Sequence, residues 1–303
     1  MGAELALFAD SLVRSTPLII AGLAVALAFR GGVFNIGAEG QLLVGAIAAT
    51  TVSLAGSDVL GRFIVVVSLI SAALAGAVWA GIAAELRRRF HVLEIISTIM
   101  LNFVAIYLVS FLVRGPLQES THIYPQTESL AASARLPLLI PGTRLHMGFA
   151  VAVAIAALLS WVFRKTAAGF RIRATGASPL AALTAGKIDI NKTSFLVFLF
   201  SGALAGIAGG IEVTGVTFAL YENLSPGYGY TAIAVALIAG LSPLGIIGSG
   251  IFFGVLETGA IALQREFGVP SSLASVVEAI FILGALTLAA MKGRRISGFT
   301  AAR

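Results

Sequence analysis

The stretch Gly31-Gly32-Val33-Phe34-Asn35-Ile36-Gly37-Ala38-Glu39-Gly40-Gln41-Leu42-Leu43-Val44-Gly45-Ala46 lies between two long apolar runs, yet it contains an Asn, a Glu, a Gln and five glycines. In hydrocarbon, non-helical backbone and ionisable groups are tolerated only where protein or a water-filled cavity surrounds them. We therefore expect this stretch to line a path through a membrane, with other helices around it. The alternative is a polar loop that places Glu39 at the membrane interface. The glycines favour the path because they allow close backbone approach.

The composition of the whole chain is that of a protein embedded in lipid. Of its 303 residues, 58% are hydrophobic and only 11% are charged, and the mean hydropathy is +0.99. Soluble domains carry about 25% charged residues. Since a membrane-crossing helix needs about 20 apolar residues, the chain has room for about nine or ten crossings. We predict an all-α integral membrane protein, a polytopic bundle in one transmembrane domain spanning residues 1–303.

Charge and cysteine content exclude several classes of function. The net charge of +6 and pI of 10.1 would suggest nucleic-acid binding in a soluble protein, but the basic residues here flank hydrophobic runs, as the positive-inside rule requires. We therefore expect the lipid bilayer, and no nucleic acid, as a partner. The chain has no cysteine and three widely separated histidines, so we expect no thiol chemistry and no metal site.

Hydrophobic runs predict nine membrane helices. Thr16-Pro17 is interpreted as the cap and first turn of the first helix, and Gly56-Ser57-Asp58 as a polar link between the second and third. Gly202 and Gly206 are spaced for close packing of one helix against another. The expected helices cover about residues 11–29, the end of the opening stretch to 55, 63–84, 93–113, 146–163, 193–216, 229–240, 247–264 and 273–291.

The fourth predicted helix carries a polar stripe. Glu94, Thr98 and Asn102 are four residues apart and Ser97 adjoins them, so all four share one helix face. In lipid such a face must point into the protein. The side chains could line a substrate path or join helices through hydrogen bonds worth about 0.6 kcal/mol each. The sequence does not separate these two interpretations.

The distribution of Lys and Arg orients the chain. If residues 85–92 are cytoplasmic and the helices alternate, fourteen basic residues lie on the cytoplasmic side and six on the other. Residues 114–145 then form an extracytoplasmic loop and residues 164–192 a cytoplasmic loop. This orientation places the N-terminus outside.

The cytoplasmic loop contains a short helix with clear ends. Ser178 suits the cap, Pro179 the first helical position and Gly186 the residue after the end. So short a helix needs a partner surface. Its small and apolar residues suit a groove on a cytoplasmic protein, although resting on the membrane surface is the alternative. We expect the following residues to make this contact: Gly176, Ser178, Pro179, Leu180, Ala181, Ala182, Leu183 and Gly186.

No nucleotide site or catalytic group is evident. A phosphate-binding loop needs G-x-x-x-x-G-K-[ST], but position 181 is Ala and Gly186-Lys187 is followed by Ile188. No nucleophile with a base and no carboxylate pair can be argued. We expect a non-enzymatic chain without a cofactor of its own, so any ATP and Mg²⁺ would be bound by a partner.

At this point the residues match a known family. The run from Thr16 to Arg30 followed by Phe34–Gln41 resembles the permease subunits of bacterial ABC importers for nucleosides and simple sugars, within the wider family that also serves ribose and branched-chain amino acids. Glu94–Asn102, the Gly169–Gly186 loop and Ala232–Gly240 match as well. The resemblance extends from about Leu12 to Met291.

The resemblance implies a partner set and a fold. It implies a permease that forms a homo- or heterodimer with a second permease, two cytoplasmic ATP-binding subunits docked on coupling helices, and an extracytoplasmic substrate-binding lipoprotein. The segment Ser178–Gly186 corresponds to the coupling helix. The fold would be similar to that of the ten-helix vitamin B12-type permeases, with the first helix missing or encoded upstream of the assigned start.

Three functional hypotheses follow. The first is the transmembrane subunit of an ABC importer in the bacterial cytoplasmic membrane, translocating a nucleoside or related simple sugar. An ion-coupled secondary transporter using Glu39, Glu212, Glu257 or Glu278 is the second, and a non-transporting membrane scaffold is the third. The substrate-path residues expected under the first are Asn35, Glu39, Gln41, Glu94, Ser97, Thr98 and Asn102.

Overall fold

A computed structural model describes residues 2–186 and 188–267, together with 276, 279, 280, 283, 284 and 287. The described residues are helical or irregular, with only two isolated β-bridges. The predicted helix at 273–291 lies almost wholly outside them. The elements are α1 (Gly2–Arg30), α2 (Ala38–Leu60), η1 (Gly61–Phe63), α3 (Ile64–Phe90), α4 (Glu94–Val113), η2 (Ala132–Ala134), α5 (Gly148–Lys165), α6 (Ala167–Ala177), α7 (Pro179–Gly186), α8 (Ile190–Glu212), η3 (Val213–Thr217), α9 (Tyr228–Ile238) and α10 (Pro243–Phe267).

Six helical segments in the described part of the chain are long and apolar enough to cross a membrane. One of them, Ala38–Phe90, contains the two helices α2 and α3, which pack against each other. The prediction of a polytopic all-α membrane protein is confirmed. The six segments are Ala6–Arg30, Ala38–Phe90, Glu94–Val113, Gly148–Lys165, Ile190–Thr217 and Pro243–Glu266.

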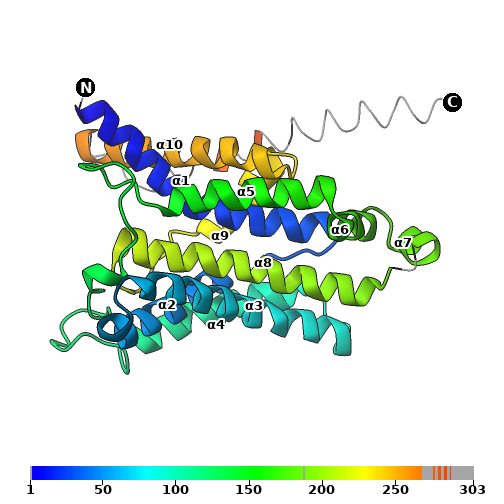
Figure 1. Ribbon diagram of the computed structural model, residues 1–303, viewed down its shortest axis with the longest axis horizontal. Coiled ribbons are helices and arrows are strands. Elements are labelled where there is room, and N and C mark those ends of the chain that lie inside the picture. Colours follow the sequence, from blue (N-terminus) through cyan, green and yellow to red (C-terminus); the bar gives the residue numbers. More distant parts are fainter. Residues whose placement is uncertain are drawn as a thin grey trace.

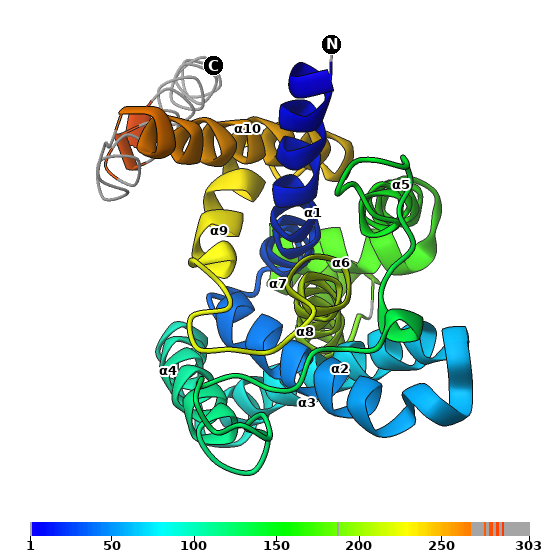
Figure 2. The same ribbon diagram turned by 90° about the vertical axis from the view of Figure 1, so that its left-hand side faces the viewer.

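Two helices form the centre of the bundle. Figure 2 shows α1 and α8 with the other long helices around them. In its most apolar part α1 is 89% buried, whereas the corresponding parts of α4, α5 and α10 are each 28% buried. Exposed apolar side chains such as Leu74, Phe103 and Trp161 cover the outer helices. This arrangement suits a protein whose outer face contacts lipid.

The bundle has two ends that differ in structure. In Figure 1 the long helices run lengthwise, with α6 and α7 at the right and the start of α1 at the left. We call the right-hand end, with α6, α7 and the α3–α4 connection, the α7 end. The left-hand end, with the connections 114–147 and 218–227, is the long-loop end. Residues 85–92 and 164–192, the two segments predicted to be cytoplasmic from their Lys and Arg, both lie at the α7 end.

The interpretation of Thr16-Pro17 as a cap and first turn is wrong, and the helix predicted from about residue 11 starts earlier. The helix α1 begins at Gly2 and continues through Pro17. Proline lacks the N–H that would bond the Val13 carbonyl four residues before it, and the hydroxyls of Ser15 and Thr16 both donate to the preceding Leu12 carbonyl, at 2.8 and 2.9 Å. Proline is tolerated here because neighbouring helices surround this part of α1, where Leu18, Ile19 and Ile20 are at most 2% exposed.

The predicted link at Gly56-Ser57-Asp58 is also wrong. These residues continue α2, and the chain turns at Gly61, whose φ of +51° is unfavourable for other residues. A one-turn 3₁₀ helix then leads into α3. Likewise, Glu85 to Phe90 extend α3 instead of following it.

Small residues bring α8 against α2 and α3. A methyl group on Gly206 would lie 2.1 Å from the Ala72 carbonyl oxygen, and one on Gly202 would lie 2.4 Å from that of Gly76. The predicted close packing at Gly202 and Gly206 is therefore confirmed. The backbones touch here because no side chain separates them.

The two connections at the long-loop end rest on each other. Thr127 N donates to the Leu220 carbonyl at 2.8 Å, and Leu136 N donates to Thr214 at 2.8 Å. These bonds fix the long connection 114–147 over the end of α8 and the segment that leads to α9.

Candidate functional site

The opening stretch forms a buried polar junction between helices. Residues 31–37 are non-helical and return from the end of α1 into the bundle, where α2 begins at Ala38. The Asn35 side chain donates to Gln41 Oε1 and to Ser201 Oγ, both at 2.9 Å, and accepts from Gly37 N. Ser201 in turn donates to the Ala24 carbonyl of α1 at 2.8 Å. The junction thus joins α1, α2 and α8.

Glu39 joins the starts of two helices. It lies in the first turn of α2, is 3% exposed, and accepts a 2.7 Å hydrogen bond from Gly229 N in the first turn of α9. Free N–H groups at helix N-termini favour a carboxylate. Glu39 is therefore held where α2 and α9 both begin.

Asn102 joins α4 to the same junction. Its Oδ1 accepts from Gly40 N at 2.8 Å, and its Nδ2 donates to the Ile36 carbonyl at 3.0 Å and to the Tyr230 hydroxyl at 3.3 Å. One side chain thus satisfies backbone groups on both sides of the start of α2.

The rest of the polar stripe also points inward. Thr98 is fully buried and packs against Gly37, while its hydroxyl donates to the Glu94 carbonyl at 2.6 Å. The Ser97 hydroxyl bonds to carbonyls of its own helix. The expected orientation of the stripe is confirmed.

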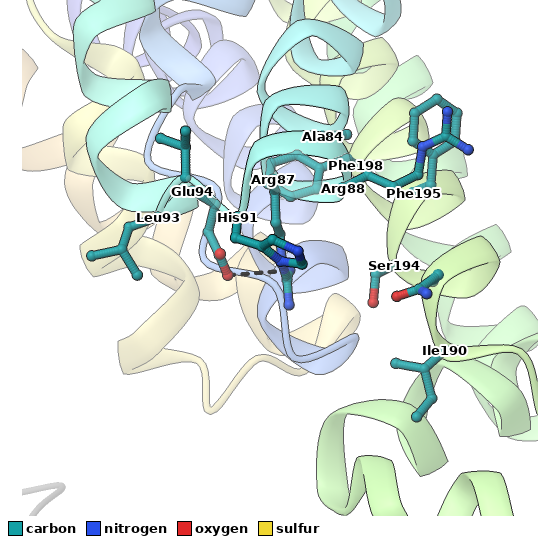
Figure 3. A pocket seen from close by; sticks show the side chains of 12 residues that line it. Ala84, Arg87, Arg88, His91, Leu93, Glu94, Ile190, Ser194, Phe195 and Phe198 are labelled. Atoms are coloured by element: carbon teal, nitrogen blue, oxygen red, sulfur yellow. Dashed lines mark ion pairs between the residues drawn. The ribbon is translucent and has the colours of Figure 1, made fainter.

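A cavity of about 450 Å³ lies at the α7 end between residues 84–94 and 190–198. Figure 3 shows the ion pair in its wall between Arg87 of α3 and Glu94 of α4, with Nη1 and Oε1 3.2 Å apart. The same carboxylate oxygen lies 3.4 Å from Phe34 N. Glu94 therefore connects this cavity to the segment 31–37.

A second cavity, of about 480 Å³, lies at the long-loop end. Its lining comes from the starts of α1 and α9, the ends of α8 and α10, η3, Arg144 and residues 221–226. Tyr228 lines it, and the next residue, Gly229, donates to Glu39. One residue of the chain thus separates the lining of this cavity from the hydrogen bond to Glu39.

The predicted path residues thus occupy one continuous region between two cavities at opposite ends. All seven are brought together, and Asn35, Glu39, Gln41, Thr98 and Asn102 are at most 3% exposed. Their hydrogen bonds are made with protein, so the region is closed in this conformation. Sequence reasoning missed Ser201, Gly229 and Tyr230; the sequence predicts Gly229 and Tyr230 only as the start of the helix at 229–240.

The predicted contact helix is present at the α7 end. The helix α7 begins at Pro179, as expected, and includes Gly186 as its last residue. Leu180 and Leu183 are 72% and 52% exposed. The preceding helix α6 touches the opening stretch: a methyl group on Gly176 would lie 2.1 Å from the Arg30 carbonyl oxygen and 2.8 Å from Gly32 N.

Comparison with known proteins identifies the family. The family described as branched-chain amino acid transport system / permease component matches residues 7–286. A glucose ABC transporter permease protein of Haloferax volcanii is 39% identical over 297 residues, covering 95% of this chain and 78% of that protein. A guanosine ABC transporter permease protein of Bacillus subtilis is 38% identical over 278 residues, covering 90% and 79%. A nucleoside ABC transporter permease protein of Lactococcus lactis is 31% identical over 282 residues, covering 90% and 77%.

No solved structure matches the chain. The family match covers the polar junction, both cavities, and α6 and α7. The six apolar segments agree with a multi-pass protein of the cytoplasmic membrane. The chain therefore belongs to the permease-component family of branched-chain amino acid transport systems, whose members are membrane subunits of ABC transporters.

Proposed function

We propose that this protein is the transmembrane subunit of an ABC importer that moves a nucleoside or a simple sugar across the cytoplasmic membrane. The similar permeases named for guanosine, nucleosides and glucose support this substrate class. The protein itself is not an enzyme. ATP and Mg²⁺ would be bound and used by a separate ATP-binding subunit, and an extracytoplasmic substrate-binding lipoprotein would deliver the solute.

The path would run from the cavity at the long-loop end to the cavity at the α7 end. One observation favours this route: Tyr228, Gly229 and Glu39 lead inward from one cavity, and Phe34 and Glu94 lead to the other. The hydrogen bonds between these points would open and reform as the helices shift between two packed arrangements. The α7 end would face the cytoplasm.

Residues 176–186 would transmit the movement of the ATP-binding subunit. The exposed leucines of α7 suit a groove on that subunit, and a helix of eight residues gains stability from such a partner. In this proposal residues 1–303 form one permease domain that dimerises with itself or a related permease. Its fold would have about nine membrane helices in the vitamin B12-type arrangement.

Uptake measurements test the proposed function. Cells would express the chain with its ATP-binding and substrate-binding partners and receive labelled adenosine or labelled glucose. The control would replace the lysine of the phosphate-binding loop in the ATP-binding subunit. We expect uptake of at least one solute, and its loss in the control. Uptake that survives in the control and stops when the proton gradient is collapsed would contradict the proposal and support a secondary transporter.

A further inference from the structure

The cavity at the long-loop end contains a buried carboxylate that the proposed path does not use. Glu212 is the last residue of α8, lines this cavity and is 3% exposed. No hydrogen bond or ion pair joins its carboxylate to another residue within the described part of the chain. A buried polar group without a partner is costly, and more so within a membrane span. A ligand that donates hydrogen bonds would offset this cost.

The backbone that follows Glu212 forms a widened turn at the wall of the cavity. Residues 213–217 form a π-helical turn, in which Phe218 N donates to the Val213 carbonyl at 2.9 Å. A helix closed by i→i+5 bonds has more residues per turn than an α-helix, so residues four and five positions on both lie near the first. Val216 and Thr217 accordingly line the cavity together with Glu212. Such π turns occur frequently at functional sites.

The charges around the cavity favour a neutral, polar ligand. Arg14 and Glu257 form an ion pair of 3.0 Å in its wall, and Asp10 and Arg144 bring one more charge of each sign. An anion would meet three carboxylates, and a cation would meet two guanidinium groups. Within the described residues, no set of three or more His, Asp or Glu side chains is arranged to hold a metal ion.

The remaining lining suits a solute with an apolar face and hydroxyl groups. The rings of Tyr221 and Tyr228 and the side chain of Leu224 provide apolar surface, and Asn223 provides an amide. The volume of about 480 Å³ lies in the range of small-molecule sites. A carboxylate accepts hydrogen bonds from adjacent hydroxyls, as acidic residues do from ribose in dinucleotide-binding folds.

We infer that this cavity binds the vicinal hydroxyls of a sugar ring, in a nucleoside or a hexose, with Glu212 as the acceptor. The inference rests on the proposed function and adds to it the site at which the solute enters the subunit. The bound ring lies on Tyr228, one residue from the contact between Gly229 and Glu39. Glu212 is thus a specificity-determining residue of the import path.

Selectivity for the diol is the first test. Uptake of adenosine and of 2′,3′-dideoxyadenosine would be measured for the wild-type importer, for Glu212→Gln and for the control Glu128→Gln, an exposed carboxylate outside the cavity. One hydrogen bond corresponds to up to about tenfold in affinity, and the two hydroxyls of the diol make two such bonds to the Glu212 side chain. We expect the wild type and the control to prefer adenosine at least about tenfold, and Glu212→Gln to reduce this preference to less than about threefold. An unchanged preference, or none in the wild type, would overturn the inference while leaving the proposed function intact.

Labelling provides a readout that does not require Glu212 to be changed. Because the chain has no cysteine, Val216→Cys introduces a single thiol in the cavity, and Asp58→Cys places one at the end of α2, outside it. We expect a membrane-impermeant maleimide to label both in the assembled importer. Adenosine or glucose should protect only the thiol at position 216 from the maleimide. The solute that protects this thiol shows whether the site binds a nucleoside or a hexose. Protection by neither, or equal protection by dideoxyadenosine, would overturn the inference. If no solute is taken up at all, the proposed function itself fails.

Discussion

The amide side chains of Asn35 and Gln41 hydrogen-bond to each other in both directions, with Nδ2 to Oε1 at 2.9 Å and Nε2 to Oδ1 at 3.0 Å. Neither side chain is exposed by more than 1%. The pair holds the non-helical segment 31–37 against the first turn of α2. Because Asn35 also bonds Ser201, the pair fixes this segment to the central helix α8.

Replacing Asn35 should therefore destabilise the folded protein. The variant Asn35→Ala leaves Gln41, Ser201 and Gly37 N without their partner, and each buried unsatisfied group costs about 1–3 kcal/mol. We expect the free energy of unfolding in detergent to fall by about 2–4 kcal/mol. The control Thr51→Val removes an exposed hydroxyl that bonds only to its own helix and should change the free energy by less than about 0.5 kcal/mol. Equal effects of the two variants would contradict the assigned role.

The contact between α2 and α9 leaves no room for a side chain at Gly229. A methyl group there would lie 2.2 Å from Glu39 N and 2.5 Å from Glu39 Cα. We expect Gly229→Ala to separate the two helix starts, break the bond to Glu39 and reduce uptake at least tenfold. The control Gly248→Ala meets no atom within 4 Å and should leave uptake unchanged. Full activity of Gly229→Ala would show that α9 can shift without consequence.

The exposed leucines of α7 should determine assembly with the ATP-binding subunit. In the double variant Leu180→Asp and Leu183→Asp, charges replace apolar surface at residues that are not needed inside the bundle. We expect loss of co-purification with that subunit and loss of uptake, with the melting temperature of the isolated chain unchanged. Ile123→Asp, which changes an exposed residue at the long-loop end, should have no such effect. Retained co-purification in the double variant would exclude α7 as the docking helix.

Acid should loosen the long-loop end through Glu222. Arg114 donates two hydrogen bonds, of 2.6 and 2.7 Å, and Ser110 donates a third, which together lower the pKa of Glu222 from 4.5 to about 2. The folded state thus favours the ionised carboxylate. The resulting contribution to the free energy of unfolding is complete above about pH 4.5 and is lost as the pH falls through about 2.

Melting temperatures of the wild type and Glu222→Gln, measured in detergent between pH 7 and pH 2, check this expectation. The difference between the two proteins should be largest above pH 4.5 and should shrink towards pH 2. A constant difference over the whole range would mean that the ionisation of Glu222 makes no contribution.

The sequence was sufficient for the parts of the fold that depend on local composition. Apolar run lengths predict most of the membrane helices, and the spacing of Glu94, Thr98 and Asn102 predicts the buried face of α4. Proline and glycine were less reliable guides. Pro17 and Gly56 mark boundaries in water, but in a membrane helix the surrounding protein satisfies or covers the backbone, and both residues lie inside helices.

The cavity around Glu212 and the partners of Asn35 could not be predicted from the sequence, because they depend on the tertiary structure. From the sequence, Glu212 is only one of four candidate glutamates of an ion-coupled transporter. Its cavity is assembled from α1, Arg144, the 221–228 segment and α10, which are far apart in the chain. No sequence pattern indicated the π turn at 213–217. Similarly, Ser201 looks like an ordinary small residue of an apolar helix until Asn35 is placed beside it.

The contact of Gly176 with Arg30 and Gly32 joins α6 directly to the non-helical segment that follows α1. Since α6 runs directly into α7, a displacement of α7 by about one ångström would act on residues 31–32 through a single backbone contact. Backbone atoms in contact have no side-chain rotamers to absorb such a movement. In the proposed importer, a movement of α7 would thus reach residues 31–32 without the long helices having to bend.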